Sequence, residues 1–266
     1  MTTQEFSNEF DILFNNISSN AAPGLNEYEK SVLLTKAQLE ILRNYFNPMG
    51  NKYREGFDGS QKRQIDFSGL IKVSKPLKLD DTAIGSIVKF DDRSVLYYMP
   101  DDILYILNET ARVTYDKGCI KNPNGYEHKI TIVPMAFDEY NVMNARPYKQ
   151  PYKQQGWRLL NRPGVQTVNG AADYISEIIV KEGAEMSNYT VRYVRMPQPI
   201  ILMDFSKEQD FDEKFVDLTV MGRNKRTECE LDPSIHNEIL QRAVEIAKNA
   251  YIGDINTMLQ LGTRSE

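Results

Sequence analysis

Few residues of this 266-residue sequence have the types and spacing that catalysis or metal binding requires. The histidines, His128 and His236, could serve in acid–base or nucleophilic chemistry, but no motif such as G-x-S-x-G flanks either of them. We expect His128 at the start of a strand and His236 in a solvated or capping position in a first helical turn. The cysteines, Cys119 and Cys229, lack the paired spacing of a zinc site or of a disulfide framework. The sequence therefore predicts no catalytic residue and no metal ligand.

Paired acidic residues are the next candidates, because two carboxylates can share a metal ion or divide the roles of acid and base. Adjacent residues of a strand point to opposite faces, so such pairs seldom converge on one ion. Turns and helix starts are the favoured interpretation of the three pairs, Asp80-Asp81, Asp91-Asp92 and Asp101-Asp102. The sequence also lacks the glycine-rich loops that bind phosphates. We expect no cofactor and no enzymatic activity.

One segment, residues 141–164, interleaves basic and aromatic side chains. From residue 141 to residue 172 there is no Asp or Glu, which reverses the local charge in a chain of net charge −5. The segment also holds the only tryptophan of the chain. The residues that this composition singles out as candidate contacts are Arg146, Tyr148, Tyr152, Trp157 and Arg158.

Two functions fit this segment. Basic residues among aromatics can bind nucleic acid, because they neutralise phosphates and stack on bases. Arg, Tyr and Trp are also enriched at the buried centre of protein–protein contacts. We favour a protein contact, since a chain that is acidic elsewhere can supply the complementary surface in a head-to-tail assembly. One candidate counter-surface is the acidic N-terminal stretch, with Glu5, Glu9, Asp11, Glu27 and Glu29.

Two amphipathic helices are predicted at the N-terminal end. Asn26 with Glu29 begins the longer helix, which ends near Phe46. A capping box formed by Thr2 and Glu5 begins the first helix, whose apolar stripe consists of Phe6, Phe10, Leu13, Phe14 and Ile17. Two such helices joined by a short turn should form an antiparallel hairpin.

The middle of the chain has the pattern of strands. Short runs rich in Val, Ile, Tyr and Thr alternate with turn residues; the runs are 65–73, 84–90, 95–99, 112–115, 130–133, 175–180 and 188–195. In the last run, Tyr189, Val191 and Tyr193 fall on one side, and Thr190, Arg192 and Val194 on the other. After Pro100, the pair Asp101-Asp102 favours a short helix instead, because acidic residues stabilise a helix N-terminus.

A last helix and an apolar tail complete the chain. Asp232 caps this helix, Pro233 takes its first position, and Gly253 ends it. Residues 254–266 form a tail that could dock on a partner through Ile255, Met258, Leu259 and Leu261. The predicted fold is α+β, with a hairpin at 1–60, a β-rich middle domain at 61–227, and residues 228–266 rejoining the hairpin in a helical bundle.

Composition sets the broad class of the protein. Apolar residues make up 41% of the chain, enough for a buried core, and no stretch approaches the roughly 20 apolar residues that span a bilayer. The N-terminus has no apolar region of a signal peptide. A pI near 5.3 argues against coating nucleic acid through bulk electrostatics. We therefore expect a soluble globular protein of a reducing compartment.

Several segments resemble structural proteins of crAss-like phages of Bacteroides. The match covers most of the chain in order, through residues 5–46, 189–202 and 229–254. The middle signature, residues 132–160, has the pattern P-x-x-x-x-E-Y, then P-Y-x-x-P, then W-R-L. These are packing and turn signatures, so they indicate a family and no active site.

The resemblance implies a virion protein of the phage neck. Such a protein would be made in the bacterial cytoplasm and would form a homo-oligomeric ring, commonly of twelve subunits. The ring would be an adaptor in the head-to-tail connector, between the portal protein and the next neck or tail ring, with DNA passing through its lumen. It would contact no membrane. The alternative function is a nucleic-acid-binding phage protein that uses residues 146–162.

Overall fold

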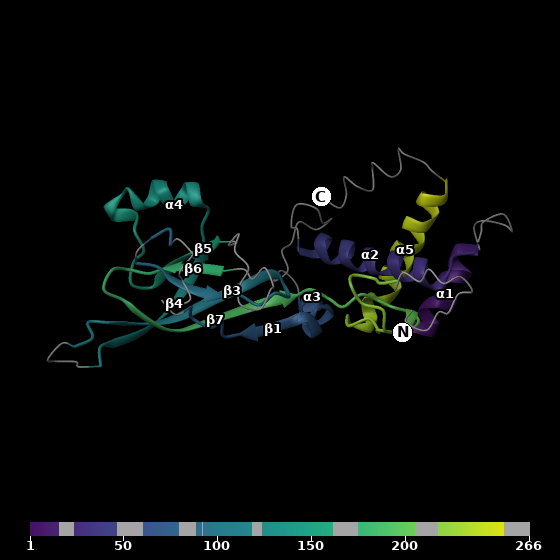
Figure 1. The fold of residues 1–266 in the computed structure, drawn as a ribbon, viewed down its shortest axis with the longest axis horizontal. Coiled ribbons are helices and arrows are strands. Elements are labelled where there is room, and N and C mark those ends of the chain that lie inside the picture. The colour runs from purple at the N-terminus through teal and green to yellow at the C-terminus, as the bar shows by residue number, and fades with distance from the viewer. Residues whose placement is uncertain are drawn as a thin grey trace. The chain divides into compact units, whose positions relative to one another are not determined.

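The computed structural model describes residues 1–15, 24–46, 61–79, 89–91, 93–118, 124–161, 175–205 and 218–252. Its contacts divide the chain into two units (Figure 1). Residues 1–70 and 197–266 form what we call the helical unit, and residues 71–196 form the sheet unit. Residues 197–227, which the sequence analysis places with the β-rich middle, group with the helices. The mixture of helices with one large sheet confirms the α+β fold class.

Helices α1 and α2 begin where the capping patterns predict. The Thr2 amide donates to Glu5 and the Glu5 amide donates to Thr2 Oγ1, which is the reciprocal capping box. Asn26 and Glu29 exchange the same pair of bonds. The helices are α1 (Thr3–Asn15), α2 (Glu27–Phe46), α3 (Gln61–Asp66) and α5 (Pro233–Ile252), with a 3-10 turn η2 (Ser68–Leu70).

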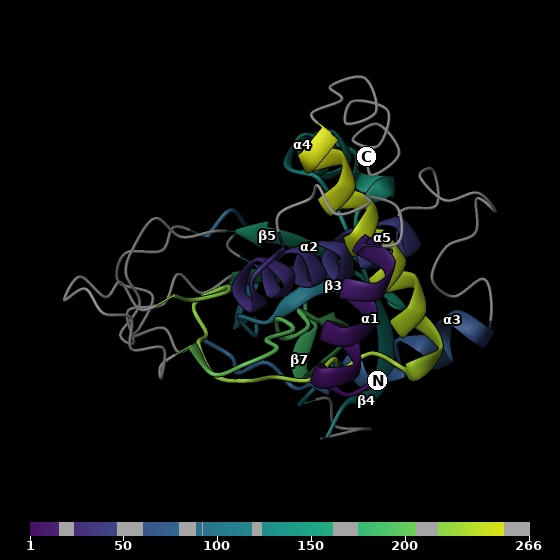
Figure 2. The ribbon, with the colours of Figure 1, turned by 90° about the vertical axis from the view of Figure 1, so that its right-hand side faces the viewer.

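Helix α5 packs against both α1 and α2 (Figure 2). The buried face of α5 includes Ile239 and Ala243. Polar contacts add to this packing: Arg242 donates to the Glu40 carboxylate of α2, and Lys248 Nζ donates to the Leu13 carbonyl of α1 at 3.0 Å. Three residues of the apolar stripe predicted for α1, Phe6, Phe10 and Phe14, are each at most 4% exposed, whereas Leu13 is half-buried and Ile17 lies outside the described residues.

The sheet unit is built on seven strands. Their order is β1-β7-β3-β4-β5-β6-β2, and every neighbouring pair is antiparallel except β4 with β5. Helix α4 (Phe137–Asn144) and the 3-10 turn η3 (Pro147–Lys149) form the crossover that the parallel pair requires. The strands are β1 (Ile71–Ser74), β2 (Val95–Tyr98), β3 (Ile103–Tyr115), β4 (Tyr126–Pro134), β5 (Gln155–Asn161), β6 (Ile175–Ile179) and β7 (Glu185–Arg195).

The helix predicted after Pro100 was wrong. Asp101 and Asp102 form the turn that precedes β3, and β3 then runs for 13 residues. Both edges of β3 are paired, with β4 on one side and β7 on the other, so long-range hydrogen bonds outweigh the local preference for a helix start. The strand predicted at 65–73 was also wrong in its first half, where α3 and η2 precede β1. Most of the strand predicted at 84–90 lies outside the described residues.

The sheet curls back on itself around a buried interior. Tyr97 of β2 and Tyr189 of β7 stack with ring centroids 4.9 Å apart, although four strands separate β2 from β7 in the sheet order. Tyr189, Val191 and Tyr193 are buried and Arg192 is exposed, as the predicted alternation of β7 requires, but Val194 of the opposite side is buried as well. The interior is completed by residues of β2, β3, β4 and β6, among them Ala111, Val113, Ile130, Ile132 and Ile178.

His236 is buried, so the solvated position predicted for it was wrong. It is 4% exposed, its Nε2 donates to the Leu231 carbonyl at 3.0 Å, and its ring packs against Phe6. Burial lowers the pKa of His236 below its ordinary value, against the opposing effect of the Leu231 bond.

This lowered pKa predicts a loss of stability in acid. The unfolded chain binds the His236 proton more readily than the folded one, so the stabilisation is full above about pH 6.5 and falls as the pH drops below it. We expect His236→Gln, which keeps a donor but does not titrate, to flatten this dependence. Thermal unfolding of both proteins, followed by circular dichroism from neutral pH to about pH 5, tests this. Parallel pH profiles would contradict it.

Candidate interaction surfaces

The basic and aromatic segment folds as the end of α4, the turn η3 and strand β5. Tyr140 of α4 packs edge-on against Trp157 of β5, with centroids 6.2 Å apart at 89°. Leu159 of β5 and Ile179 of β6 complete this buried cluster beneath α4. The segment is therefore held on the sheet through α4, as Figure 1 shows.

Two of the five candidate residues in this segment contact their own unit. Trp157 is 4% exposed and lies in the cluster under α4. Arg158 points to the other face of β5, where its Nε donates to the Glu109 carboxylate of β3 at 2.8 Å. The Tyr189 hydroxyl donates to the same carboxylate. This buried group ties β3, β5 and β7 together, so Arg158 acts inside the sheet unit.

The other three candidates are exposed and lie close together in sequence. Tyr148 is fully exposed, at 102% of its reference area, and Tyr152 is 60% exposed. Arg146 is exposed beside them, and its carbonyl accepts from the Lys149 amide at 2.9 Å, which closes the turn η3. We call residues 146–153 the aromatic loop. The candidate tail residues, Ile255, Met258, Leu259 and Leu261, lie outside the described residues.

A polar network fixes α4, which carries the aromatic loop. Arg93 donates to Asp91 at 2.7 Å and to Asn144 Oδ1 at 2.9 Å, and the Tyr140 hydroxyl also donates to Asp91. The Arg93 guanidinium holds the pKa of Asp91 at about 2, so this carboxylate stays ionised at neutral pH. Burial, together with Asp91, raises the pKa of Tyr140 to about 12. The loop therefore extends from a rigid support.

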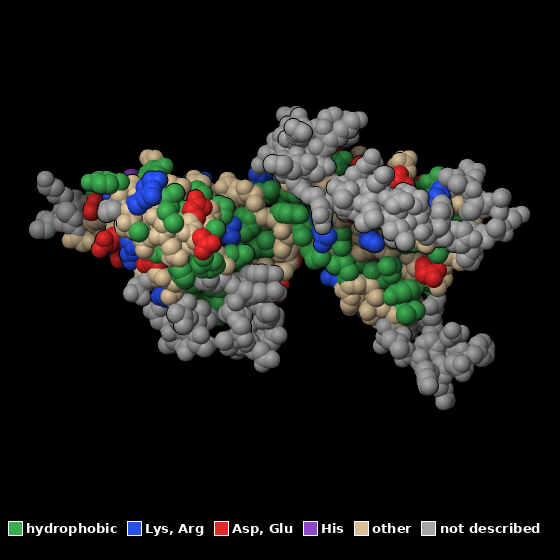
Figure 3. Space-filling view, turned by 90° about the horizontal axis from the view of Figure 1, so that it is seen from above, with side chains coloured by type: hydrophobic (Ala, Val, Ile, Leu, Met, Phe, Trp, Pro, Cys, Tyr) green, Lys and Arg blue, Asp and Glu red, His purple; other side chains and the backbone are tan. Residues whose placement is uncertain are grey.

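Exposed apolar side chains accompany the aromatic loop. Val142 and Phe137 of α4 are 54% and 37% exposed, and Phe90 is 45% exposed with its ring 5.1 Å from that of Phe137. Figure 3, which views this side of the sheet unit, shows hydrophobic side chains interspersed with Lys and Arg. Apolar area beside exposed tyrosines and cations is typical of a protein contact.

The sequence analysis missed a second charged surface, on the outer face of the sheet. Thr110 and Arg112 of β3, Lys129 of β4, and Thr190 and Arg192 of β7 point away from the buried interior. The alternation in 189–195 placed two of them on the outside. Strand pairing brings Thr190 and Arg192 beside residues of β3 and β4, and no local sequence pattern predicts that pairing.

Two kinds of site are absent from the described residues: a metal-binding cluster and a membrane-spanning helix. Within the ranges given above, no group of three or more His, Cys, Asp or Glu residues could hold a metal ion. In the same part of the chain, no helix is long and apolar enough to cross a membrane.

Comparison with known proteins identifies the family. The model of the phage tail ring protein 3/4 family matches residues 1–258. "Ring protein 4/5" of Bacteroides phage crAss001 is 47% identical over the full length of both chains. "Ring protein 3" of the same phage is 27% identical over 248 residues, or 93% of this chain and 95% of that protein.

The chain therefore belongs to the phage tail ring protein 3/4 family. This confirms the resemblance to structural proteins of crAss-like phages, and it makes the protein a structural ring component of a phage virion. Its relatives are named for the ring and for no enzymatic reaction. The aromatic loop and the outer sheet face are therefore candidate surfaces for protein contacts.

Removing the buried carboxylate should destabilise the sheet unit. Glu109→Ala leaves Arg158 buried without its counter-charge, so we expect a loss of about 3–5 kcal/mol in the free energy of unfolding. Trp157, the only tryptophan, reports on this unit by fluorescence during denaturant unfolding.

The matched control is Glu185→Ala, which removes an exposed ion pair with Lys117 from the same unit. Its cost should be below about 1 kcal/mol. Equal losses in the two variants would show that the buried pair contributes nothing beyond a surface pair.

Proposed function

We propose that this protein forms a ring in the head-to-tail connector of the phage, as an adaptor between the portal protein and the next neck or tail ring. The observation that carries the proposal is the aromatic loop: Tyr148 and Tyr152 are exposed on a support that Trp157 and Tyr140 hold rigidly. Membership in a ring protein family supports it. Side chains presented in this way lose little conformational entropy when they bind.

Ring closure requires contacts between two different faces of the same protein. Tyrosine and arginine supply much of the affinity in such contacts, because they bury a large area and also form hydrogen bonds. Arg146 and the two tyrosines of the aromatic loop are exposed side chains of these types. We propose that the loop contacts a neighbouring subunit or an adjoining ring, and that the ring contains twelve copies.

The charge of the chain suits a passage for DNA. Tight binding to DNA depends on phosphates neutralised by Lys and Arg. A net charge of −5 disfavours such binding over the surface as a whole, so DNA could move through a lumen lined by these subunits.

Nucleic-acid binding through residues 146–162 is the second candidate. Arg146, Lys149 and Lys153 are exposed next to tyrosines, which favours it. Arg158 is engaged with Glu109, which reduces the positive charge available. Titration with labelled DNA at several salt concentrations separates the two functions, because phosphate binding weakens steeply with salt.

Truncating the loop tyrosines should impair assembly. In the double variant Tyr148→Ala, Tyr152→Ala, we expect the fraction of chains in rings to fall at least tenfold, because two anchors of about 1–2 kcal/mol or more are lost. Electron microscopy of the protein mixed with portal protein and neighbouring ring proteins measures this fraction.

Tyr126→Ala is the matched control. Tyr126 is 55% exposed on β4, outside the aromatic loop, so its loss should leave rings intact. The proposal fails if the double variant assembles as well as this control does.

The tail gives a separate prediction for the portal contact. Residues Ile255, Met258, Leu259 and Leu261 are apolar, and we propose that they bind a neighbouring subunit or the portal protein. Deleting residues 254–266 should leave thermal unfolding unchanged and weaken co-purification with the portal protein. Full binding by the shortened chain would contradict this role.

A further inference from the structure

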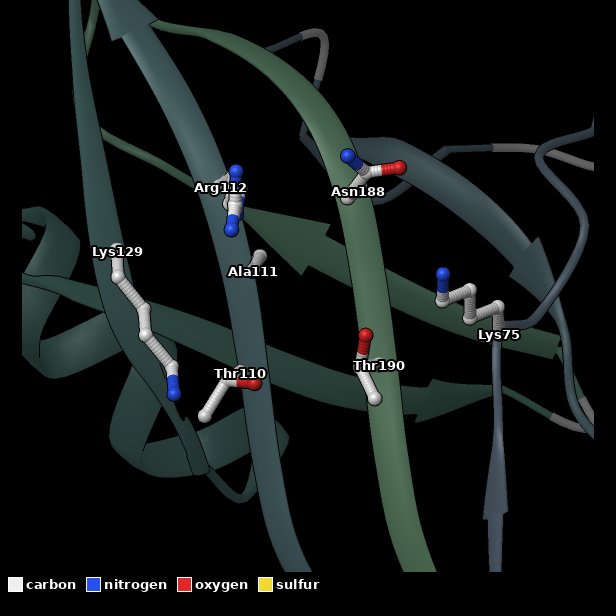
Figure 4. Close-up of a pocket in the computed structure, with 7 residues that line it drawn as sticks. All are labelled: Lys75, Thr110, Ala111, Arg112, Lys129, Asn188 and Thr190. Atoms are coloured by element: carbon white, nitrogen blue, oxygen red, sulfur yellow. The ribbon is translucent and has the colours of Figure 1, made fainter.

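The outer face of strands β1, β7, β3 and β4 concentrates positive charge. A trough of about 470 Å³ on this face is lined by Lys75, Arg112 and Lys129, together with Thr110, Ala111, Asn188 and Thr190. None of the described residues that line the trough is acidic. Figure 4 shows Lys129 and Lys75 on either side of the two threonines, with Arg112 and Asn188 above them. Arg192, also exposed, extends the charge along β7.

Among the cations of this face, Arg112 alone has an ion pair within the described residues. Arg112 lies directly opposite Lys129 in the β3–β4 register. Like charges in directly opposed positions destabilise a sheet. Glu127 offers Arg112 an ion pair at 3.5 Å, between side chains that are 59% and 53% exposed, and such a pair is weak. The described residues provide no ion pair for Lys75, Lys129 or Arg192. An acidic partner would relieve this repulsion.

The two units of the chain carry opposite net charge. Residues 71–196 contain 17 Lys and Arg against 15 Asp and Glu, whereas the rest of the chain contains 15 against 22. The acidic surplus therefore belongs entirely to the helical unit. A second copy of the chain thus offers the kind of surface that the basic face lacks.

The helical unit has an acidic groove between α2 and α5. It measures about 290 Å³, and the described residues that line it are Glu40, Glu238, Glu245, Arg242, Ile41, Asn44 and Gln241. Arg242 is bound to Glu40 and Glu245, which leaves the groove with net negative charge. Asn44 Oδ1 is buried without a hydrogen-bond partner in the described residues. The groove can therefore bind a surface that presents both positive charge and hydrogen-bond donors.

The spacing of the charges on the two surfaces is similar. Glu238 and Glu245 are seven residues apart on α5, which places them about 10 Å apart along the helix axis. Cations two strands apart on the sheet, such as Lys75 and Arg112, are also separated by about 10 Å or slightly more. Lys and Arg side chains are long enough to take up the remaining difference.

We infer that the basic face of the sheet unit docks on the acidic α2–α5 groove of a second copy of the chain. This head-to-tail contact rests on the proposed ring function and specifies which two faces meet. Duplex DNA is the other ligand that a basic face could bind, but DNA binding would not explain the negative charge of the α2–α5 groove.

Charge reversal on each surface tests the contact in the full chain. Lys75→Glu with Arg112→Glu should abolish ring assembly, and so should Glu238→Lys with Glu245→Lys. The chain that carries all four substitutions should recover rings, because the two reversed surfaces are again complementary. Lys181→Glu changes an exposed charge outside the basic face and should assemble normally. All variants should unfold at the temperature of the unaltered chain, since the altered side chains are at the surface.

The outcomes separate this inference from the proposed function. If the unaltered chain forms no rings with portal protein and neighbouring ring proteins, both fail. If it forms rings and the two double variants also do, the docking inference alone fails. Recovery in the fourfold variant supports docking. If the double variant of the basic face loses binding to a labelled DNA duplex but still forms rings, the docking inference is overturned, and the basic face is assigned to binding the phosphates of DNA.

Discussion

The buried carboxylate of Glu109 is the constraint on which the sheet unit depends. It pairs with Arg158 of β5 and accepts from the Tyr189 hydroxyl of β7, so three strands are fixed around one interior charge. Removing one member leaves the others buried and unpaired, which is far more costly than losing a surface pair. Since side chains alternate along a strand, an inward-facing Glu109 places Thr110 and Arg112 of the same strand on the outer face of the sheet.

The same alternation explains why the predicted contact segment divides into two parts. Trp157 packs beneath α4, and Arg158 points to the interior; both stabilise the scaffold. Tyr148 and Tyr152 precede β5 and are free of this packing, so they present large side chains to solvent. A structural ring protein needs both properties, because contacts that must hold under load benefit from a support that does not rearrange.

Local patterns were sufficient for helices α1, α2 and α5, but not for α3 and α4. The capping boxes at Thr2 and Asn26 depend on neighbours three residues away, so the sequence contains all the information they need. The helix predicted after Pro100 failed because the state of β3 is decided by pairing with β7 residues far away in the sequence, such as Ile103 with Arg195. His236 and the outer basic face were misjudged or missed for the same reason: burial and strand order are properties of the whole fold.

The central claim is that the protein functions by binding copies of itself and adjoining virion parts in a closed ring around the DNA path. Electron microscopy of the virion neck, with this chain located by a label, tests that claim most directly. The account predicts a closed, rotationally symmetric ring of this chain between portal and tail, coaxial with the DNA. Single copies, or a location away from the neck, would contradict it.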